Sequence, residues 1–147
     1  MKDLFLAMLV LCLSMLHACH AYAEVKEFSD FSIDLPPGWD IQREGATAAF
    51  IARDKSATLV VTVESTADTF FEGMSAEELA EAYAEEFKGS KPVKADPNCY
   101  SFTFKSPEGV DSEASIIVME KRFYLITISG KHKDLIGMVE SVLLSIL

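Results

Sequence analysis

The stretch FSIDLPPGW, residues 31–39, indicates the fold class of this 147-residue chain. Apolar and polar residues alternate over 31–35, which predicts a strand with one apolar face. The two prolines that follow lack a backbone N–H, so they end the strand, and Gly38 gives the turn its backbone freedom. Trp39 is the only tryptophan of the chain. Its large apolar body predicts a core residue rather than a binding residue.

The rest of the chain is predicted to be mostly β-structure, beginning with a β-meander. Up to five short strands are expected before any helix, and three more follow the first helix. The last two strands contain continuous apolar runs, which are typical of a sheet covered on both faces. Beyond the strand at 31–35, the expected strands are 40–43, 46–53, 57–64, 100–105, 112–120 and 122–129. In the strand at 57–64, one face is expected to carry Leu59, Val61 and Val63, and the other Thr58, Val60, Thr62 and Glu64.

Two amphipathic helices are predicted. Ser75 and Glu78 form an S-x-x-E capping box at the start of the first, and Gly89 is expected to end it. Its apolar face is formed by Ala76, Leu79, Ala80, Tyr83 and Phe87. The second helix follows residues 130–133, and its core-facing stripe is Leu135, Ile136, Val139, Val142, Leu143 and Ile146, widened by Met138 and Leu144.

The composition indicates one globular domain with an acidic surface. Half of the residues are hydrophobic, and the net charge is −10. A phosphate backbone and an anionic lipid surface both attract Lys and Arg clusters. The charge therefore argues against a nucleic-acid partner and against adhesion to anionic membranes.

Residues 1–23 are predicted to be a signal peptide, with residues 24–147 as the mature domain. The apolar run 4–16 is shorter than the roughly 20 residues that span a bilayer, and Ala21-Tyr22-Ala23 supplies a cleavage pattern. The protein is therefore expected to be periplasmic or secreted. Two alternatives are an uncleaved anchor and a lipoprotein, since residues 16–19 resemble a lipobox with Cys19 as the acylated residue.

Little in the sequence indicates chemistry. Cleavage would leave Cys99 as the only cysteine, which is interpreted as inert, and His132 as a lone histidine beside two lysines. Neither predicts a metal site or a catalytic triad. No catalytic, cofactor-binding or metal-ligating residue is predicted, and the protein is expected not to be an enzyme, although a carboxylate pair for hydrolysis stays open.

Two further groups of residues have a structural and a functional interpretation. Phe70 and Phe71 are expected to tuck a loop onto the domain, with a ligand lip as the alternative. The outer face of the first helix is expected to be solvated, with binding of a cation or a basic partner as the alternative. That face carries Glu77, Glu81, Glu85 and Glu86.

The motif F-x-I-x-x-P-P-G-W after a signal sequence, together with the order of elements, resembles the PsbP-like superfamily. This superfamily also includes the Ran-binding Mog protein of yeast and bacterial envelope proteins such as DcrB and LpqN. The resemblance covers most of residues 25–147. It implies an α+β fold in which helices flank an antiparallel sheet as an α/β/α sandwich. It also implies a binding or accessory role, and no catalytic motif transfers.

Two function hypotheses follow. The first is an exported, non-catalytic accessory protein that binds another envelope protein through a basic surface or a hydrophobic segment of that partner. The second is a small-ligand or cation carrier, and an acid-pair hydrolase is a third. An exposed apolar groove would favour the first hypothesis, and a closed pocket with converging polar groups would favour the second.

Overall fold

The computed structural model describes residues 23–67 and 69–147. The predicted signal peptide and lipobox lie outside the described residues, apart from Ala23. In chain order the elements are β1 (Glu24–Glu27), β2 (Ser32–Leu35), β3 (Trp39–Glu44), β4 (Thr47–Ala52), β5 (Ala57–Ser65), α2 (Ala76–Glu86), β6 (Val93–Asp96), β7 (Cys99–Lys105), β8 (Asp111–Met119), β9 (Arg122–Gly130) and α3 (Leu135–Ile146).

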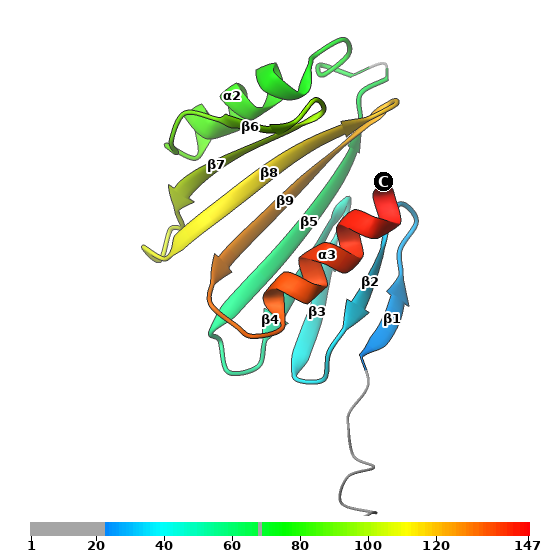
Figure 1. Cartoon of the computed structure of the whole chain (residues 1–147), viewed down its shortest axis with the longest axis vertical. Coiled ribbons are helices and arrows are strands. Elements are labelled where there is room, and N and C mark those ends of the chain that lie inside the picture. The colour runs from blue at the N-terminus through cyan, green and yellow to red at the C-terminus, as the bar shows by residue number, and fades with distance from the viewer. Residues whose placement is uncertain (1–22, 68) are drawn as a thin grey trace, which may run out of the picture.

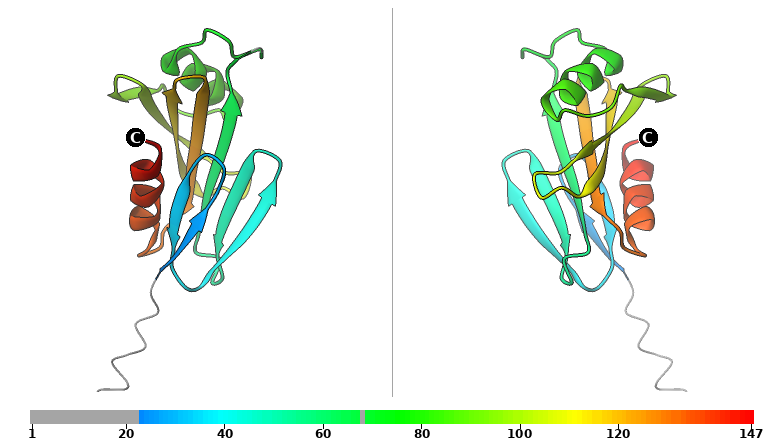
Figure 2. Two further views of the ribbon diagram at one scale, coloured as in Figure 1. Left: turned by 90° about the vertical axis from the view of Figure 1, so that its right-hand side faces the viewer. Right: turned by 90° about the vertical axis from the view of Figure 1, so that its left-hand side faces the viewer.

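A seven-stranded antiparallel sheet in the order β3-β4-β5-β9-β8-β7-β6 forms the centre of the domain (Figure 1). Helix α2 packs against β7 and β8 on one face, which we name the α2 face. Helix α3 and the β1–β2 hairpin pack on the opposite face, the α3 face (Figure 2). The predicted α+β single domain, with helices flanking an antiparallel sheet, is confirmed.

Each face of the sheet is covered over only part of its width. Under α2 the buried sheet residues come from β7, β8 and β9, whereas Thr58, Val60 and Thr62 of β5 stay partly exposed on the same face. On the α3 face the buried residues come mainly from β3, β4, β5 and β9, while Glu113 and Ser115 of β8 are not buried. The two uncovered areas therefore lie on opposite faces and toward opposite edges of the sheet.

The stretch 31–39 connects two sheets. Strand β2 pairs with β1, which the sequence did not assign, in a two-stranded sheet separate from the main one. The prolines end β2, and a hydrogen bond from the Arg53 N–H to the Gly38 carbonyl (2.9 Å) fixes the turn into β3. Trp39 then enters the core with 4% of its surface exposed, as predicted.

Two serines of α3 accept hydrogen bonds from backbone N–H groups on the edge of β2 that does not pair with β1. The Ser145 hydroxyl accepts a hydrogen bond from the Ser32 N–H, and the Ser141 hydroxyl accepts one from the Asp34 N–H, both at 3.0 Å. Serines four residues apart lie on one helix face, and alternate residues of a strand point their N–H groups to one edge. The helix therefore occupies an edge that could otherwise pair with another strand.

Replacing Ser141 or Ser145 with alanine is expected to lower the free energy of unfolding by about 1 kcal/mol each, because one backbone N–H loses its partner. Urea denaturation measures the change, and hydrogen exchange at residues 32 and 34 should accelerate. Ser29→Ala, at an exposed serine of the β1–β2 turn, is the control. Equal stability of all three variants and the parent would contradict the edge-capping role.

Helix α2 begins as predicted and ends one residue earlier than predicted. The capping box of Ser75 and Glu78 is present in full. At the other end, Lys88 and not Gly89 takes the left-handed position, with φ 53°, and the Gly89 N–H donates to the Ala84 carbonyl (2.7 Å). This is a Schellman arrangement. Gly89 is needed for space, since an added Cβ would lie 2.7 Å from the Thr103 carbonyl oxygen.

The capping box predicts a pH dependence. Hydrogen bonds from the Ser75 backbone N–H and hydroxyl lower the pKa of Glu78 below its ordinary value of 4.5. A carboxylate with a lowered pKa in the folded state contributes stability above its unfolded pKa and loses it as pH falls through the folded pKa. We therefore expect the stability difference between the parent protein and Glu78→Gln to be largest near neutral pH and to shrink in acid. Urea titrations between pH 7 and pH 3 measure it, and a difference constant with pH would contradict the expectation.

Two sequence predictions need correction. In α3, Leu135, Met138 and Val142 are buried, but Ile136 is 72% exposed and Leu144 is 81% exposed. Most residues of α3 are apolar, so the sequence pattern did not separate the buried face from the exposed one, and the predicted core-facing stripe was too wide. Strand β6 was not predicted, because its four residues are all exposed and lie between Pro92 and Pro97. Four strands thus follow α2 where three were expected.

Candidate functional site

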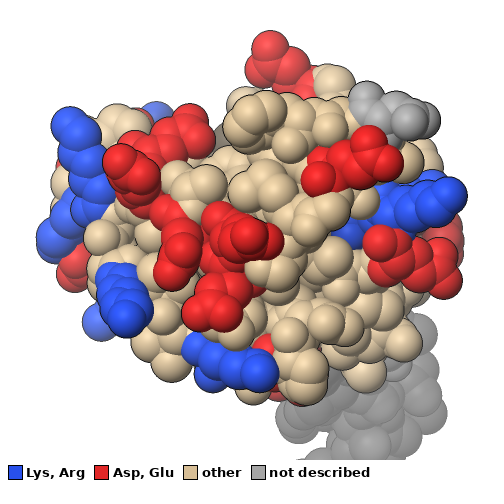
Figure 3. All heavy atoms as spheres, turned by 90° about the horizontal axis from the view of Figure 1, so that it is seen from above, with Lys and Arg blue, Asp and Glu red and all other residues tan. Residues whose placement is uncertain are grey.

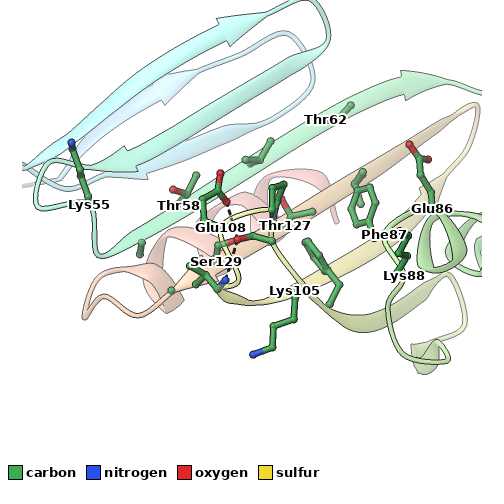
Figure 4. A pocket seen from close by; sticks show the side chains of 18 of the residues that line it. Lys55, Thr58, Thr62, Glu86, Phe87, Lys88, Lys105, Glu108, Thr127 and Ser129 are labelled. Carbon is green, nitrogen blue, oxygen red and sulfur yellow. Dashed lines mark hydrogen bonds between the residues drawn. The ribbon is translucent and has the colours of Figure 1, made fainter.

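A groove with a volume of about 1010 Å³ lies on the uncovered part of the α2 face (Figure 4). Its floor is the β5–β9 pair. One end is formed by the C-terminal end of α2, and the loop between β7 and β8 forms a side. The groove exists because α2 lies over β7, β8 and the first part of β9, so that β5 and the rest of β9 have no helix above them.

The floor mixes hydroxyl and aliphatic side chains in register across the two strands. Three cross-strand pairs face the groove: Thr58 with Ser129, Val60 with Thr127, and Thr62 with Leu125. The hydroxyls are partly held by neighbouring strands: Thr62 shares a hydrogen bond with Thr47 (2.9 Å) and Ser129 with Ser112 (2.7 Å). The floor therefore offers apolar contact together with donors and acceptors.

Aromatic and charged residues surround this floor. The ring of Phe87 stacks at a tilt on Phe104, with centroids 4.9 Å apart, and both rings line the groove. In Figure 4, Lys55 lies at one end of the groove, while Phe87 and Lys88 lie at the other. The charged lining residues are Lys55, Lys88, Lys105, Glu86 and Glu108.

The charge of the groove differs from that of the whole chain. Three of its five charged lining residues are lysines, in a chain of net charge −10. Lys105 also forms an ion pair with Asp111 beside the groove. Hydrogen bonds from its own backbone N–H and from the Ser106 hydroxyl lower the pKa of Glu108, so this carboxylate is ionised at neutral pH. It is thus unsuited to act as a general acid.

His132 joins three parts of the chain at the end of the sheet. Its ring meets the Trp39 ring edge-on, with centroids 5.0 Å apart. Its Nδ1 accepts a hydrogen bond from the Asp134 N–H (3.2 Å), and its Nε2 lies 3.9 Å from the Asp54 carboxylate. Hydrogen bonds from the Ser56 side chain and backbone, with the nearby His132, lower the pKa of Asp54. This cluster packs the loops before β5 and α3 against Trp39.

The other residues singled out in the sequence do not converge on a site. Cys99 is half-buried, and burial together with Asp96 raises the pKa of its thiol, which disfavours the reactive thiolate. The acidic residues of α2 are exposed, and Figure 3 shows acidic side chains gathered at this end of the molecule. Within residues 23–67 and 69–147, no group of three or more His, Cys, Asp or Glu side chains could hold a metal ion.

Of the two adjacent aromatic residues in the loop before α2, Phe71 packs against the domain and Phe70 is exposed. Phe71 meets Phe123 of the α2 core with ring centroids 5.1 Å apart. Phe70 contacts Phe71 but is 89% exposed. The expectation that this pair tucks the loop onto the domain therefore applies to Phe71.

Sequence reasoning did not find the groove. It assigned the polar face of 57–64 correctly, with Thr58, Val60, Thr62 and Glu64 on one side. Whether that face is covered depends on how many strands α2 spans, and periodicity carries no information on this. The lysines come from the β4–β5 turn, the end of α2 and the end of β7, so only the folded chain brings them around one floor.

The fold of this chain is similar to that of a solved structure. The solution structure of cyanobacterial PsbP (CyanoP) from Synechocystis sp. PCC 6803 superposes with a TM-score of 0.53 over 85% of this chain and 91% of that chain. The chain has a PsbP-like fold. Sequence identity over the match is 11%, so the likeness concerns the PsbP-like fold alone, and the resemblance drawn from FSIDLPPGW is confirmed at that level.

A crystal structure from Bacteroides thetaiotaomicron VPI-5482 matches at a TM-score of 0.48, with 15% identity over 85% of this chain and 47% of that chain. No protein-family model matches the chain, and neither does any curated protein. Among the described residues, no helix is long and apolar enough to span a bilayer.

Proposed function

We propose that this protein is an exported, non-catalytic binding protein that holds an extended segment of another envelope protein in the groove above β5 and β9. The observation that carries the proposal is the groove itself, an open surface of about 1010 Å³ on a sheet face without a covering helix. Its floor of aliphatic and hydroxyl side chains suits a peptide, which has both apolar side chains and unpaired backbone groups.

The charges around the groove favour a segment that combines apolar and acidic residues. Lys55 and Lys88 stand at opposite ends of the floor. Val60, Leu125 and Phe87 would bury the apolar side chains of the segment, and the lysines would meet carboxylates at its ends.

The proposal of a binding role without catalysis rests on the lack of a converging set of reactive groups among the described residues. The groove lining contains no histidine or cysteine, and Glu108 is ionised rather than poised as an acid. His132 is engaged by Asp134 and packs on Trp39. The resemblance to a superfamily of mostly binding and accessory proteins supports the same proposal.

We propose that residues 1–23 act as a signal peptide that directs export. Strand β1 begins at Glu24, so cleavage after Ala23 would leave every described strand intact. We expect intact-mass analysis of the protein from the envelope fraction to give a chain that begins at Glu24 without lipid. A diacylglycerol adduct on Cys19 would contradict this and would make the protein a membrane-tethered lipoprotein.

Site-specific photocrosslinking tests the groove. A photoreactive residue at Thr127, in the middle of the floor, is expected to crosslink one partner protein in the native host, and the crosslinked peptide should contain acidic and apolar residues. The same photoreactive residue at exposed Ser29, in the β1–β2 turn, is the control. Equal crosslinking from both positions, or a crosslinked peptide rich in Lys and Arg, would overturn the proposal.

A small ligand is the second candidate, because the groove volume reaches the upper end of the range for small-molecule sites, about 300–1,000 Å³. Native mass spectrometry of the isolated protein separates the two candidates. A bound molecule of a few hundred daltons that Thr127→Trp displaces would favour the ligand carrier and contradict the peptide-binding role.

A further inference from the structure

A second, separate surface lies on the opposite face of the sheet, beside α3. An apolar slot of about 250 Å³ runs between α3 and β8–β9. Its apolar lining residues are Ile126, Ile128, Leu135, Ile136 and Val139, and its polar ones are Glu113, Ser115 and Glu140. Ile136 is 72% exposed at its border, and Leu147 at the end of the chain is 80% exposed.

The sheet next to this slot has room for one more helix. Beside α3, four residues that point to the α3 face are small or exposed, namely Ser101 and Thr103 of β7 and Glu113 and Ser115 of β8. Toward the other end of β8, Ile117 is buried in the α3-face core. Two neighbouring strands span about 10 Å, which is close to the diameter of one helix. A helix laid there would lie beside α3 at an ordinary helix–helix distance of about 8–10 Å.

The charges of this surface indicate which helix would fit. Glu113 on the sheet and Glu140 on α3 stand on the two sides of the slot, and both side chains are exposed. The whole chain has a net charge of −10. A second copy of this chain would bring its own carboxylates to the same place, and an anionic membrane would be repelled.

We propose that the slot between α3 and β8 docks a basic amphipathic helix of a partner protein. An aliphatic side chain of that helix enters the slot between Ile136 and Ile126, and Lys or Arg residues on its flanks meet Glu113 and Glu140. This proposal uses none of the groove residues, so it holds or fails independently of the function proposed above. With both surfaces occupied, the protein would connect two partners across one sheet.

A designed peptide provides the probe. An 18-residue amphipathic peptide of Leu and Lys is titrated into the isotopically labelled protein as isolated from the cell, and amide shifts are followed by NMR. A peptide with the same Leu positions but Glu in place of Lys is the charge control. We expect saturable binding of the Leu/Lys peptide, with the largest shifts at residues 113–115 and 136–140, weakening as salt rises.

Matched variants locate the binding. Ile136→Ser and the double variant Glu113→Gln/Glu140→Gln are each expected to weaken binding at least fivefold. Val25→Ser, at an exposed apolar residue of β1, and Glu81→Gln/Glu85→Gln, on the acidic face of α2, should change it less than twofold. Thr127→Trp in the groove should also leave the affinity unchanged.

Several outcomes would overturn the proposal: no binding of the Leu/Lys peptide, equal binding of the Leu/Glu peptide, or shifts centred on α2. Concentration-dependent dimerisation that Ile136→Ser abolishes would assign the surface to a second copy instead. Displacement of the peptide by residues 1–22, detected only in unprocessed protein, would assign it to the N-terminal segment of the chain.

Discussion

Trp39→Ala is expected to lower the free energy of unfolding by about 3–5 kcal/mol, in the range found for large aromatic truncations in cores. The side chain is 4% exposed and packs in the core between the sheet, the β1–β2 hairpin and α3. Against a total stability of about 5–15 kcal/mol for a typical domain, this loss should be plain in urea or thermal denaturation. The packing of the His132 side chain should also loosen in this variant, because the rings of Trp39 and His132 are in edge contact.

Trp39→Phe is the matched control. The indole Nε1 of Trp39 is buried without a hydrogen-bond partner. Phenylalanine therefore removes an unpaired donor while keeping most of the apolar contact, and its effect on stability should be much smaller than that of alanine. If Trp39→Ala left unfolding unchanged but abolished partner binding, Trp39 would belong to a recognition surface and not to the core.

Gly130→Ala is expected to lower the free energy of unfolding by about 2–6 kcal/mol. Because φ of Gly130 is +77°, an alanine there would be strained in the left-handed backbone region, at a cost of about 1–3 kcal/mol. Repacking of the atoms around the added Cβ would cost about 1–3 kcal/mol more. An added Cβ would lie 2.1 Å from the Ser56 carbonyl oxygen. That oxygen also accepts a hydrogen bond from the Lys131 N–H (3.0 Å), so the clash cannot be relieved without loss of this contact.

Gly45→Ala separates the two contributions. Gly45 also has a positive φ, +56°, but nothing lies within 4 Å of the Cβ that alanine would add. Its substitution should therefore show the strain alone, about 1–3 kcal/mol. Equal losses at Gly45 and Gly130 in urea denaturation would show that the approach of Ser56 does not matter.

Much of the fold could be predicted because local patterns and tertiary packing agree. The alternation at 57–64 placed Leu59 and Val61 in the core, and the capping box placed the start of α2 at Ser75. The errors lie where local patterns carry no information. The end of α2 was assigned to Gly89 by its conformational freedom, whereas this glycine is required by its closeness to β7.

The candidate sites were less accessible to sequence analysis than the fold. A groove depends on which strands a helix leaves uncovered, and that depends on helix length and position relative to the sheet. Ile136 illustrates this limit: its spacing from Leu135 and Val139 placed it in the core stripe, but only packing shows that it lies at the border of a slot. The pairing of β2 with β1 could likewise not be predicted from the sequence, because β1 has four residues, of which one is apolar.

The hydrogen bonds between α3 and the edge of β2 have a consequence for the order in which the domain can form. They join residues 113 and 107 positions apart, nearly the whole length of the domain. A chain still emerging from the ribosome lacks α3, so the side of β2 that packs on this helix stays uncovered until synthesis of the domain is finished. Contacts of such long sequence separation slow folding. The topology thus delays closure of the core, and under the export proposed above this delay would leave time for a translocation machinery to receive the polypeptide while it is still open.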